Sequence, residues 1–354
     1  MIIITDVNIF FDNNYHYLFF FKKNFISMLF FLKCLLLNFK CLLMFFFKVL
    51  IFLTLLNTKL SYCFEINELA ENIFVHYGSH EDTNKSNKGD IANIGFIVGE
   101  NSIMVIDTGG TKDIGTNLLR KIKSVSQLPI THIVITHSHP DHFFGTESFL
   151  SENAEIIGHE KLNRSLLSNF NFYKELQANN IENEILKNAK LVKANLIVKT
   201  NETIKIDLGN RIVEIKAWKS GHTDNDLSVY DLKTKTFWSE NIFVNRTPSV
   251  RASILGWKRN LDEIMEMDIN LVIPGHGKAL KKDEAIKPML NYFERIITQV
   301  RMFHKKNRSL QESINSILQT EIINANKVNI ENWLLFTEYH YSNVTKAFTE
   351  LEWE

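Results

Sequence analysis

The feature that most constrains the fold of this chain is a cluster of three histidines and one aspartate within six residues. The cluster consists of His137, His139, Asp141 and His142, in the stretch THSHPDH. It directly follows the apolar run 130–136 (ITHIVIT), which predicts a buried strand. Four polar side chains this close together need shared partners, and a metal ion is the natural one. We expect the first two histidines to face one ion, and the aspartate and third histidine, beyond the bend at Pro140, to face another.

Two further histidines follow predicted strands and are flanked by small residues. His222 stands in the triplet GHT after the predicted strand 211–218, and His276 stands in GHG after 271–274. Glycine lets the backbone approach closely and leaves the imidazole free to project from the end of a strand. His222 would complete a three-histidine site with the first pair, and His276 would complete its neighbour. Glu240, just beyond another predicted strand, offers a carboxylate that can bridge the two sites.

The rest of the chain from residue 64 onward predicts layered sheets with outer helices. The apolar runs that predict further strands are 73–75, 95–99, 102–107, 154–158, 203–207, 227–231 and 236–238. Helical spacing of apolar residues predicts helices at 111–125, within 160–200, at 257–265, from 283 onward, after 309 and after 342. Trp218, Trp238 and Trp257 are expected to pack in the core.

These motifs resemble those of the metallo-β-lactamase superfamily over about residues 66–280. The HxHxDH core, the GHT triplet and the stretch PGHG occur in the family's order, and IDTGG at 106–110 resembles its Asp-Thr-Gly strand end. The resemblance implies an α/β fold, a four-layer αββα sandwich with a C-terminal helical extension. It places the catalytic domain at 64–282, the extension at 283–354, and Asp107 as a support of the metal site.

The resemblance also implies a metal-dependent hydrolase. Two zinc ions are expected, while imidazole ligands also suit iron, and manganese is a further alternative. Zinc lowers the pKa of bound water toward about 7, so a metal-bound hydroxide would attack a small ester, thioester or lactone-type substrate. Asp141 would serve as a ligand and as the catalytic residue that orients the nucleophile.

One departure from the family pattern concerns the bridging position. The family has Gly-Asp where this chain has Ser239-Glu240. Glutamate keeps the charge and both oxygens but adds a methylene group. Either Glu240 bridges with shifted geometry, or the second metal site is weakened; the alternative is an exposed carboxylate at the strand end.

The remaining histidines are not expected to bind metal. We interpret His76, His80, His132, His159, His304 and His340 as surface residues or as residues that support the site from outside. The polar segment that begins at His80 and contains Glu81, Asp82 and Asp90 could overhang the site as a substrate loop.

Three longer stretches resemble a narrower group, the quinoprotein relay-system zinc metallohydrolases. They are HEDTNKSNKGDIANIGFIVG (80–99), GHTDNDLSVYD (221–231) and NVTKAFTELE (343–352). Proteins of that group are exported and associated with periplasmic quinoprotein dehydrogenases. The resemblance therefore implies a small-molecule substrate and a periplasmic dehydrogenase as partner.

The N-terminal segment 1–63 differs in composition from the rest. It holds six lysines against two aspartates, and 13 of the 27 phenylalanines. Lys48, the apolar run 49–56 and small residues at 61 and 63 predict a signal peptide cleaved before Phe64. We therefore expect a periplasmic or secreted protein with no stable membrane span after cleavage; an uncleaved anchor using more of 29–56 is the alternative.

Composition excludes several other functions for the remainder. All three cysteines lie before residue 64, which excludes a disulfide, a cysteine zinc site and a thiol nucleophile beyond it. The remainder carries 34 basic and 38 acidic side chains, so no basic excess indicates a nucleic-acid partner. Two alternatives to the hydrolase stay open: a non-haem iron oxygenase or sulfur dioxygenase on the same fold, and a non-catalytic periplasmic metal-binding accessory.

Overall fold

The chain divides into two units, Met1–Cys63 and Phe64–Glu354. The computed structural model describes residues 28–33, 35–40, 42–48, 64–323 and 332–354. In the first unit, the helix Met28–Lys48 has 21 residues and a mean hydropathy of 2.0, so it could cross a membrane by length and composition. A signal sequence near the N-terminus has the same properties. The predicted apolar run 49–56 and the residues just before the predicted cleavage site lie outside the described residues.

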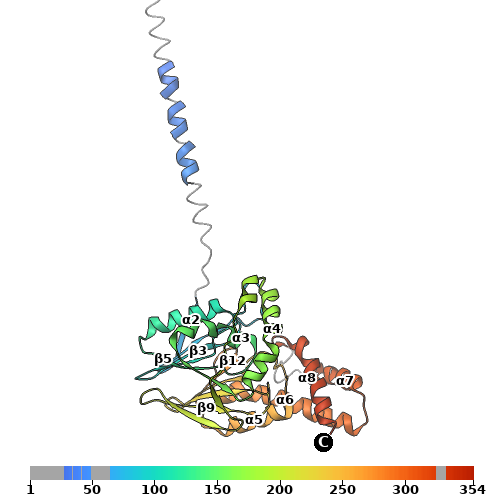
Figure 1. The fold of residues 1–354 in the computed structure, drawn as a ribbon. Coiled ribbons are helices and arrows are strands. Elements are labelled where there is room, and N and C mark those ends of the chain that lie inside the picture. The colour runs from blue at the N-terminus through green and yellow to red at the C-terminus, as the bar shows by residue number, and fades with distance from the viewer. Residues whose placement is uncertain (1–27, 34, 41, 49–63, 324–331) are drawn as a thin grey trace, which may run out of the picture. The chain divides into compact units, whose positions relative to one another are not determined.

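The second unit contains two mixed β-sheets with helices on their outer faces (Figure 1). The first sheet is ordered β1 (Asn67–Ala70), β2 (Ile73–His76), β3 (Ile94–Val98), β4 (Ile103–Ile106), β5 (Ile130–Val134), β6 (Glu155–His159) and β7 (Leu196–Val198). The second is ordered β12 (Leu271–His276), β11 (Thr236–Phe243), β10 (Leu227–Asp231), β9 (Ile212–Ala217) and β8 (Thr203–Asp207). The helices are α2 (Lys112–Val125), α3 (Pro140–Phe143), η1 (Phe144–Glu152), α4 (Leu162–Ile181), η2 (Glu184–Asn188), α5 (Ile254–Glu266), α6 (Lys282–Lys305), α7 (Leu310–Ile323) and α8 (Phe336–Leu351).

Each sheet combines an antiparallel part with a parallel part. Strands β1 to β4 pair antiparallel, and β4 to β7 pair parallel. In the second sheet, β8 to β11 pair antiparallel, and β11 pairs parallel with β12. Parallel neighbours need crossover connections, and the helices α2 and α5 supply two of them on the outer faces. The carboxyl ends of parallel strands thus meet at one edge of each sheet.

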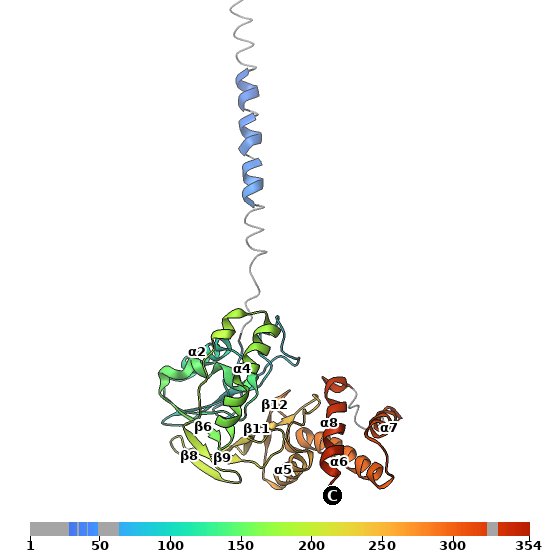
Figure 2. The same ribbon diagram turned by 45° about the vertical axis from the view of Figure 1, so that its right-hand side comes forward.

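Alternation of side chains along the strands explains the four layers. On β4, Met104 and Ile106 point into the core between the two sheets, while Val105 points to the core beneath α2 and α4. Across the sheet interface, Val213 and Ile215 of β9 belong to the same inner core. A third core lies between the second sheet and helices α5, α6 and α8. The arrangement is the predicted αββα sandwich, with helices beyond it at the C-terminus (Figure 2).

Two strands extend further along the chain than the sequence pattern predicted. Glu240 lies within β11, which continues to Phe243, and His276 is the last residue of β12. The polar run Ser-Glu-Asn interrupts the apolar pattern, but pairing with β12 carries the strand through an irregularity in register between Ser239 and Phe243. Helix α8 also begins at Phe336, earlier than the segment after 342 that was predicted.

The C-terminal helices belong to the same compact unit as the sheets. The predicted boundary at 282/283 falls in the first turn of α6, within the unit Phe64–Glu354. Met289, Tyr292 and Phe293 of α6 are fully buried in one core with Trp257 of α5 and Val344 of α8. The extension is therefore packed as an integral layer.

A buried polar network ties α6 and α8 to the loop 244–253, which joins β11 to α5. The Asn343 side chain accepts a hydrogen bond from the Val250 amide at 3.0 Å and donates to the Pro248 carbonyl at 2.6 Å and to the Tyr292 hydroxyl at 3.0 Å. Nδ1 of His340 lies 3.0 Å from the same hydroxyl. Because these groups are shielded from water, each lost bond leaves an unpaired partner.

Replacing Asn343 with Ala should lower the free energy of unfolding by about 2–3 kcal/mol, because three buried partners lose their hydrogen bonds. The neighbouring Ser342, an exposed residue whose hydroxyl bonds within its own helix, provides the control. Ser342→Ala should change the same quantity by less than about 0.5 kcal/mol. Equilibrium urea denaturation measures both, and equal values for the two variants would contradict the role given to Asn343.

His340 should make stability depend on pH. Burial, together with the Arg295 charge, lowers its pKa from 6.5 to about 4. The unfolded chain therefore takes up a proton at higher pH than the folded chain, and stability is lost as the pH falls from about 6.5 to 4. His340→Gln removes this titration, so the difference in unfolding free energy between wild type and variant should shift by about 3 kcal/mol between pH 7 and pH 4. A difference that is independent of pH would refute this.

Candidate metal centre

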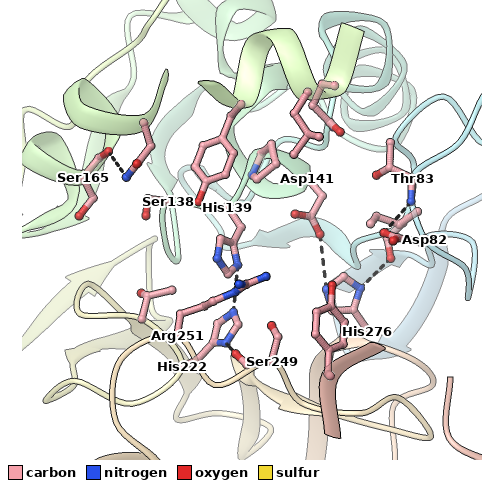
Figure 3. A pocket seen from close by; sticks show the side chains of 18 of the residues that line it. Asp82, Thr83, Ser138, His139, Asp141, Ser165, His222, Ser249, Arg251 and His276 are labelled. Atoms are coloured by element: carbon pink, nitrogen blue, oxygen red, sulfur yellow. Dashed lines mark hydrogen bonds and ion pairs between the residues drawn. The ribbon is translucent and has the colours of Figure 1, made fainter. Parts of the chain in front are cut away.

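The seven predicted ligand side chains come together at the edge where the two sheets meet. His137 and His139 follow the end of β5, and Asp141 and His142 lie in the short helix α3, which Pro140 begins. His222 follows β9, while β11 carries Glu240 and β12 carries His276. Figure 3 shows His139 and His222 on one side and Asp141 and His276 on the other.

The ligand atoms form three overlapping groups, each with its atoms within 4.8 Å of one another. The groups are His137/His139/His222, His137/His142/Glu240 and Asp141/His142/His276. The first and third are the two sites that the sequence predicted. The middle group shares one histidine with each of them, so Glu240 lies at the position that a bridging carboxylate would occupy. Metal binding by these residues stays a prediction.

Three of the histidines are oriented through Nδ1. The acceptors, all at 2.9 Å, are Asp107 Oδ2 for His142, the Ser249 carbonyl for His222 and the Ile91 carbonyl for His276. In the neutral ring, an oxygen acceptor on Nδ1 holds the proton on that nitrogen and leaves the lone pair on Nε2. Each ring is thereby prepared to bind a cation through Nε2.

Asp107 supports the site from the end of β4, where the resemblance placed it. It is fully buried, with a left-handed φ of 53°. Its carboxylate also accepts hydrogen bonds from the Thr136 amide at 2.8 Å and hydroxyl at 2.7 Å. Asp107 therefore fixes both the start of the histidine loop and the ring of His142.

The distance between two rings fits a shared ion. Nε2 of His222 lies 3.0 Å from Nδ1 of His139. Two nitrogens bound to zinc at about 2.0–2.1 Å in a tetrahedron are about 3.3 Å apart. A small outward movement of one ring would give that separation.

Unpartnered buried atoms show that the donors fit a cation. Nε2 of His137 and both carboxylate oxygens of Glu240 are buried and have no hydrogen-bond partner in the part of the chain that the structure describes. Leaving such atoms without a partner is costly. A divalent ion with nitrogen and oxygen ligands would satisfy them.

The electrostatics of the rings favour the neutral form that binds metal. Burial, reinforced by neighbouring imidazoles, lowers the pKa of His137 and His222 well below 6.5. Burial, with Arg246 nearby, does the same for His276, and burial lowers the pKa of His139 to about 4. These four rings are therefore neutral at pH 7, which is the form that can bind a metal ion without first losing a proton.

Three carboxyl groups surround the remaining ring. Nδ1 of His142 lies 2.9 Å from Asp107 and 3.2 Å from Glu240, and its Nε2 lies 3.2 Å from Asp141. Although burial lowers the pKa of His142, these carboxylates raise it well above 6.5. Burial and the neighbouring carboxylates raise the pKa of Glu240. Such a concentration of buried negative charge calls for a cation.

The backbone of β12 makes room for Glu240. A Cβ atom added at Gly275 would lie 2.1 Å from Oε2 and 2.9 Å from Cδ of Glu240. Glu240 itself is 1% exposed, which rules out the alternative of an exposed carboxylate. The glycine next to His276 therefore accommodates the longer side chain.

A cavity of about 770 Å³ opens over the predicted metal ligands. Its walls come from four segments: the loop with Asp82 and Thr83, helix α4, the loop 244–253 and helix α8. The polar segment from His80 thus reaches the cavity, as the sequence suggested. Tyr173 of α4, Arg246 and Arg251 of the loop, and Tyr339 and Lys346 of α8 also line it, and no local motif indicated them.

Of the histidines outside the ligand set, His80 is exposed, and His132 and His304 are partly exposed. His76, His159 and His340 are buried. His76 contacts Asp90 at 2.9 Å, and His159 lies 3.2 Å from the Trp218 carbonyl. None of them belongs to the three ligand groups.

Gly275→Ala should lower the free energy of unfolding by about 2–3 kcal/mol and reduce the metal content, because the new methyl group overlaps Glu240. Adding Glu240→Asp shortens the overlapping side chain, so the double variant should regain part of both losses. Urea denaturation and elemental analysis measure the effects. A stable, fully loaded Gly275→Ala variant would show that Glu240 is not held as described.

Comparison with known proteins supports this assignment. Residues 87–276 match the metallo-beta-lactamase superfamily. A linear primary-alkylsulfatase from a Pseudomonas species is 35% identical over 60 residues, which span 17% of this chain and only 11% of that protein.

Solved structures share the fold at low sequence identity. The DIM-1 metallo-beta-lactamase is 20% identical with a TM-score of 0.51, and the metallo-beta-lactamase from Pontibacter korlensis is 16% identical with a TM-score of 0.52. Each alignment covers 65% of this chain, with 96% and 98% of the other chain. The sec-alkylsulfatase Pisa1 from Pseudomonas sp. is 15% identical with a TM-score of 0.60, over 81% of this chain and 50% of that one.

The family match covers more than half of the chain, and the structure places a buried His/Asp cluster at the sheet edge. The chain belongs to the metallo-beta-lactamase superfamily, and its buried His/Asp cluster is consistent with a metallohydrolase.

Proposed function

We propose that the chain is a zinc-dependent hydrolase that holds two ions and cleaves a small ester, thioester or lactone. The observation that carries the proposal is the overlap of the three ligand groups, in which Glu240 lies between two complete triads. The cavity above them has the size of typical small-molecule sites.

The residues of the chain have separable tasks in this proposal. His137, His139 and His222 would hold one ion, and Asp141, His142 and His276 would hold the other. The metal would supply Lewis-acid activation of water and of the scissile group. Although burial raises the pKa of Asp141, the imidazoles of His142, His276 and His139 hold it well below its usual range. Asp141 therefore stays ionised and can accept a hydrogen bond that orients the attacking water.

Sulfate-ester hydrolysis is a second candidate. It is favoured by the alkylsulfatase likeness in a short sequence match and in the Pisa1 fold. This reaction needs the same ligand set, but the attacked atom is the sulfur of a sulfate ester instead of a carbonyl carbon. Substrate comparison therefore separates the two.

The proposal also includes a cellular setting. The apolar helix Met28–Lys48 supports export or anchoring, and the three longer stretches of resemblance support a link to a periplasmic quinoprotein dehydrogenase. The oxygenase and the non-catalytic accessory remain rivals that metal identity and turnover distinguish.

The purified chain should contain two zinc ions, measured by elemental analysis. It should hydrolyse at least one of 4-nitrophenyl acetate, a thioester and a simple lactone, or else 4-nitrophenyl sulfate, the second candidate. Asp141→Asn should lower kcat by at least about a hundredfold, because it removes a ligand and the group that orients water.

His132 provides a matched control, because it lies on β5, the strand that precedes the histidine loop, but outside the ligand groups. His139→Ala should lose metal and activity, while His132→Ala keeps both. One iron per chain with oxygen uptake would favour the oxygenase, and full turnover by His139→Ala would overturn the proposal.

A further inference from the structure

We propose that helix α8, which lies outside the segment matched to the family, is a substrate-binding wall of the active site. In this proposal Lys346 binds an anionic group of the substrate, and Tyr339 contacts the same molecule. The inference rests on the proposed function for its reaction but not for its binding step.

Helix α8 lies beside the cavity that contains the predicted metal ligands. Tyr339 and Lys346 line the same cavity as His139, Asp141 and His276. They are seven residues apart, two turns of one helix, so they project from the same face. Both are partly exposed, which leaves them accessible from the cavity.

Hydrogen bonds attach α8 firmly to the loop beside the candidate site. Asn343, between the two residues, binds the main chain at Pro248 and Val250. Two turns beyond Asn343, Glu350 accepts hydrogen bonds from the Ser253 hydroxyl at 2.5 Å and the Ile254 amide at 2.9 Å. Helix α8 is thus fixed to the loop 244–253, which also supplies the Ser249 carbonyl that orients His222.

The charge of this wall indicates the class of ligand. Lys346 lines the cavity together with Arg246 and Arg251. Arg246 is buried and donates to a neutral acceptor, the Glu81 carbonyl, at 2.8 Å. Within the described residues, none of these three cations forms an ion pair with a carboxylate. Unpaired cations around one cavity favour a negatively charged ligand.

Tyr339 adds an aromatic surface beside these charges. The Arg251 guanidinium lies 5.8 Å from the centre of its ring. In the part of the chain that the structure describes, its hydroxyl has no hydrogen-bond partner, so it is free to donate to a ligand. An aromatic or apolar body that ends in an anionic group would use both residues.

The test is a binding measurement with a probe that cannot be hydrolysed. We would titrate 4-nitrobenzenesulfonate into the zinc-loaded full chain by isothermal titration calorimetry. Lys346→Met should raise the Kd about fivefold or more, because the charge is lost while the length of the side chain is kept. Tyr339→Phe should raise it about two- to threefold, and Lys346→Arg should stay near wild type. Lys281→Met, at an exposed lysine before α6, is the matched control and should not change it.

The outcomes separate this inference from the proposed function. Weaker binding by Lys346→Met, with the control unchanged, supports the wall even if no ester is cleaved. With an active chain, the same variant should raise KM for the 4-nitrophenyl monoester of glutaric acid at least about threefold, whereas Lys281→Met should leave that KM unchanged. Equal Kd values for wild type and Lys346→Met, or no binding by wild type, would overturn the inference.

Discussion

The burial of three carboxyl groups among five imidazoles is the constraint on which the rest of the structure depends. Asp107, Asp141 and Glu240 all lie within 3.2 Å of the His142 ring, shielded from water between two apolar sheets. Such a cluster is stable only if a cation compensates its charge or if the groups share protons. The strand ends, the glycine beside His276 and the carbonyls that hold the rings are all arranged around that requirement.

The site is held from both sheets and from the C-terminal layer. Asp107 and the histidine loop belong to the first sheet, whereas Glu240 and His276 belong to the second. His222 is oriented by Ser249, and the loop that carries Ser249 is fixed to α6 and α8 by Asn343. A change far from the metal ligands, in the packing of α8, therefore reaches the site through a short chain of hydrogen bonds. The helical extension and the candidate metal site therefore belong to one hydrogen-bonded unit.

The sequence predicted much of this architecture because local patterns were informative. The run 130–136 and the histidines after it indicated a strand that ends in a polar loop, and this is where β5 and α3 lie. The sequence did not predict that Glu240 lies within a strand, because the polar residues of β11 resemble those that follow the end of a strand. Its burial depends on pairing with β12 and on the space at Gly275, and neither is visible in the local sequence.

The sequence by itself determined the fold class, the family and the group of side chains that can bind metal. The family and the αββα class follow from the resemblance that the short motifs carry. The first ligand cluster, 137–142, follows from local spacing, since neighbouring residues on a tight turn must project together. Only the tertiary structure decided which triads share a histidine, how Glu240 lies between them, and that α4, the loop 244–253 and α8 enclose the cavity. Those contacts join segments that are tens of residues to more than a hundred residues apart, and long-range packing, rather than local pattern, brings such segments together.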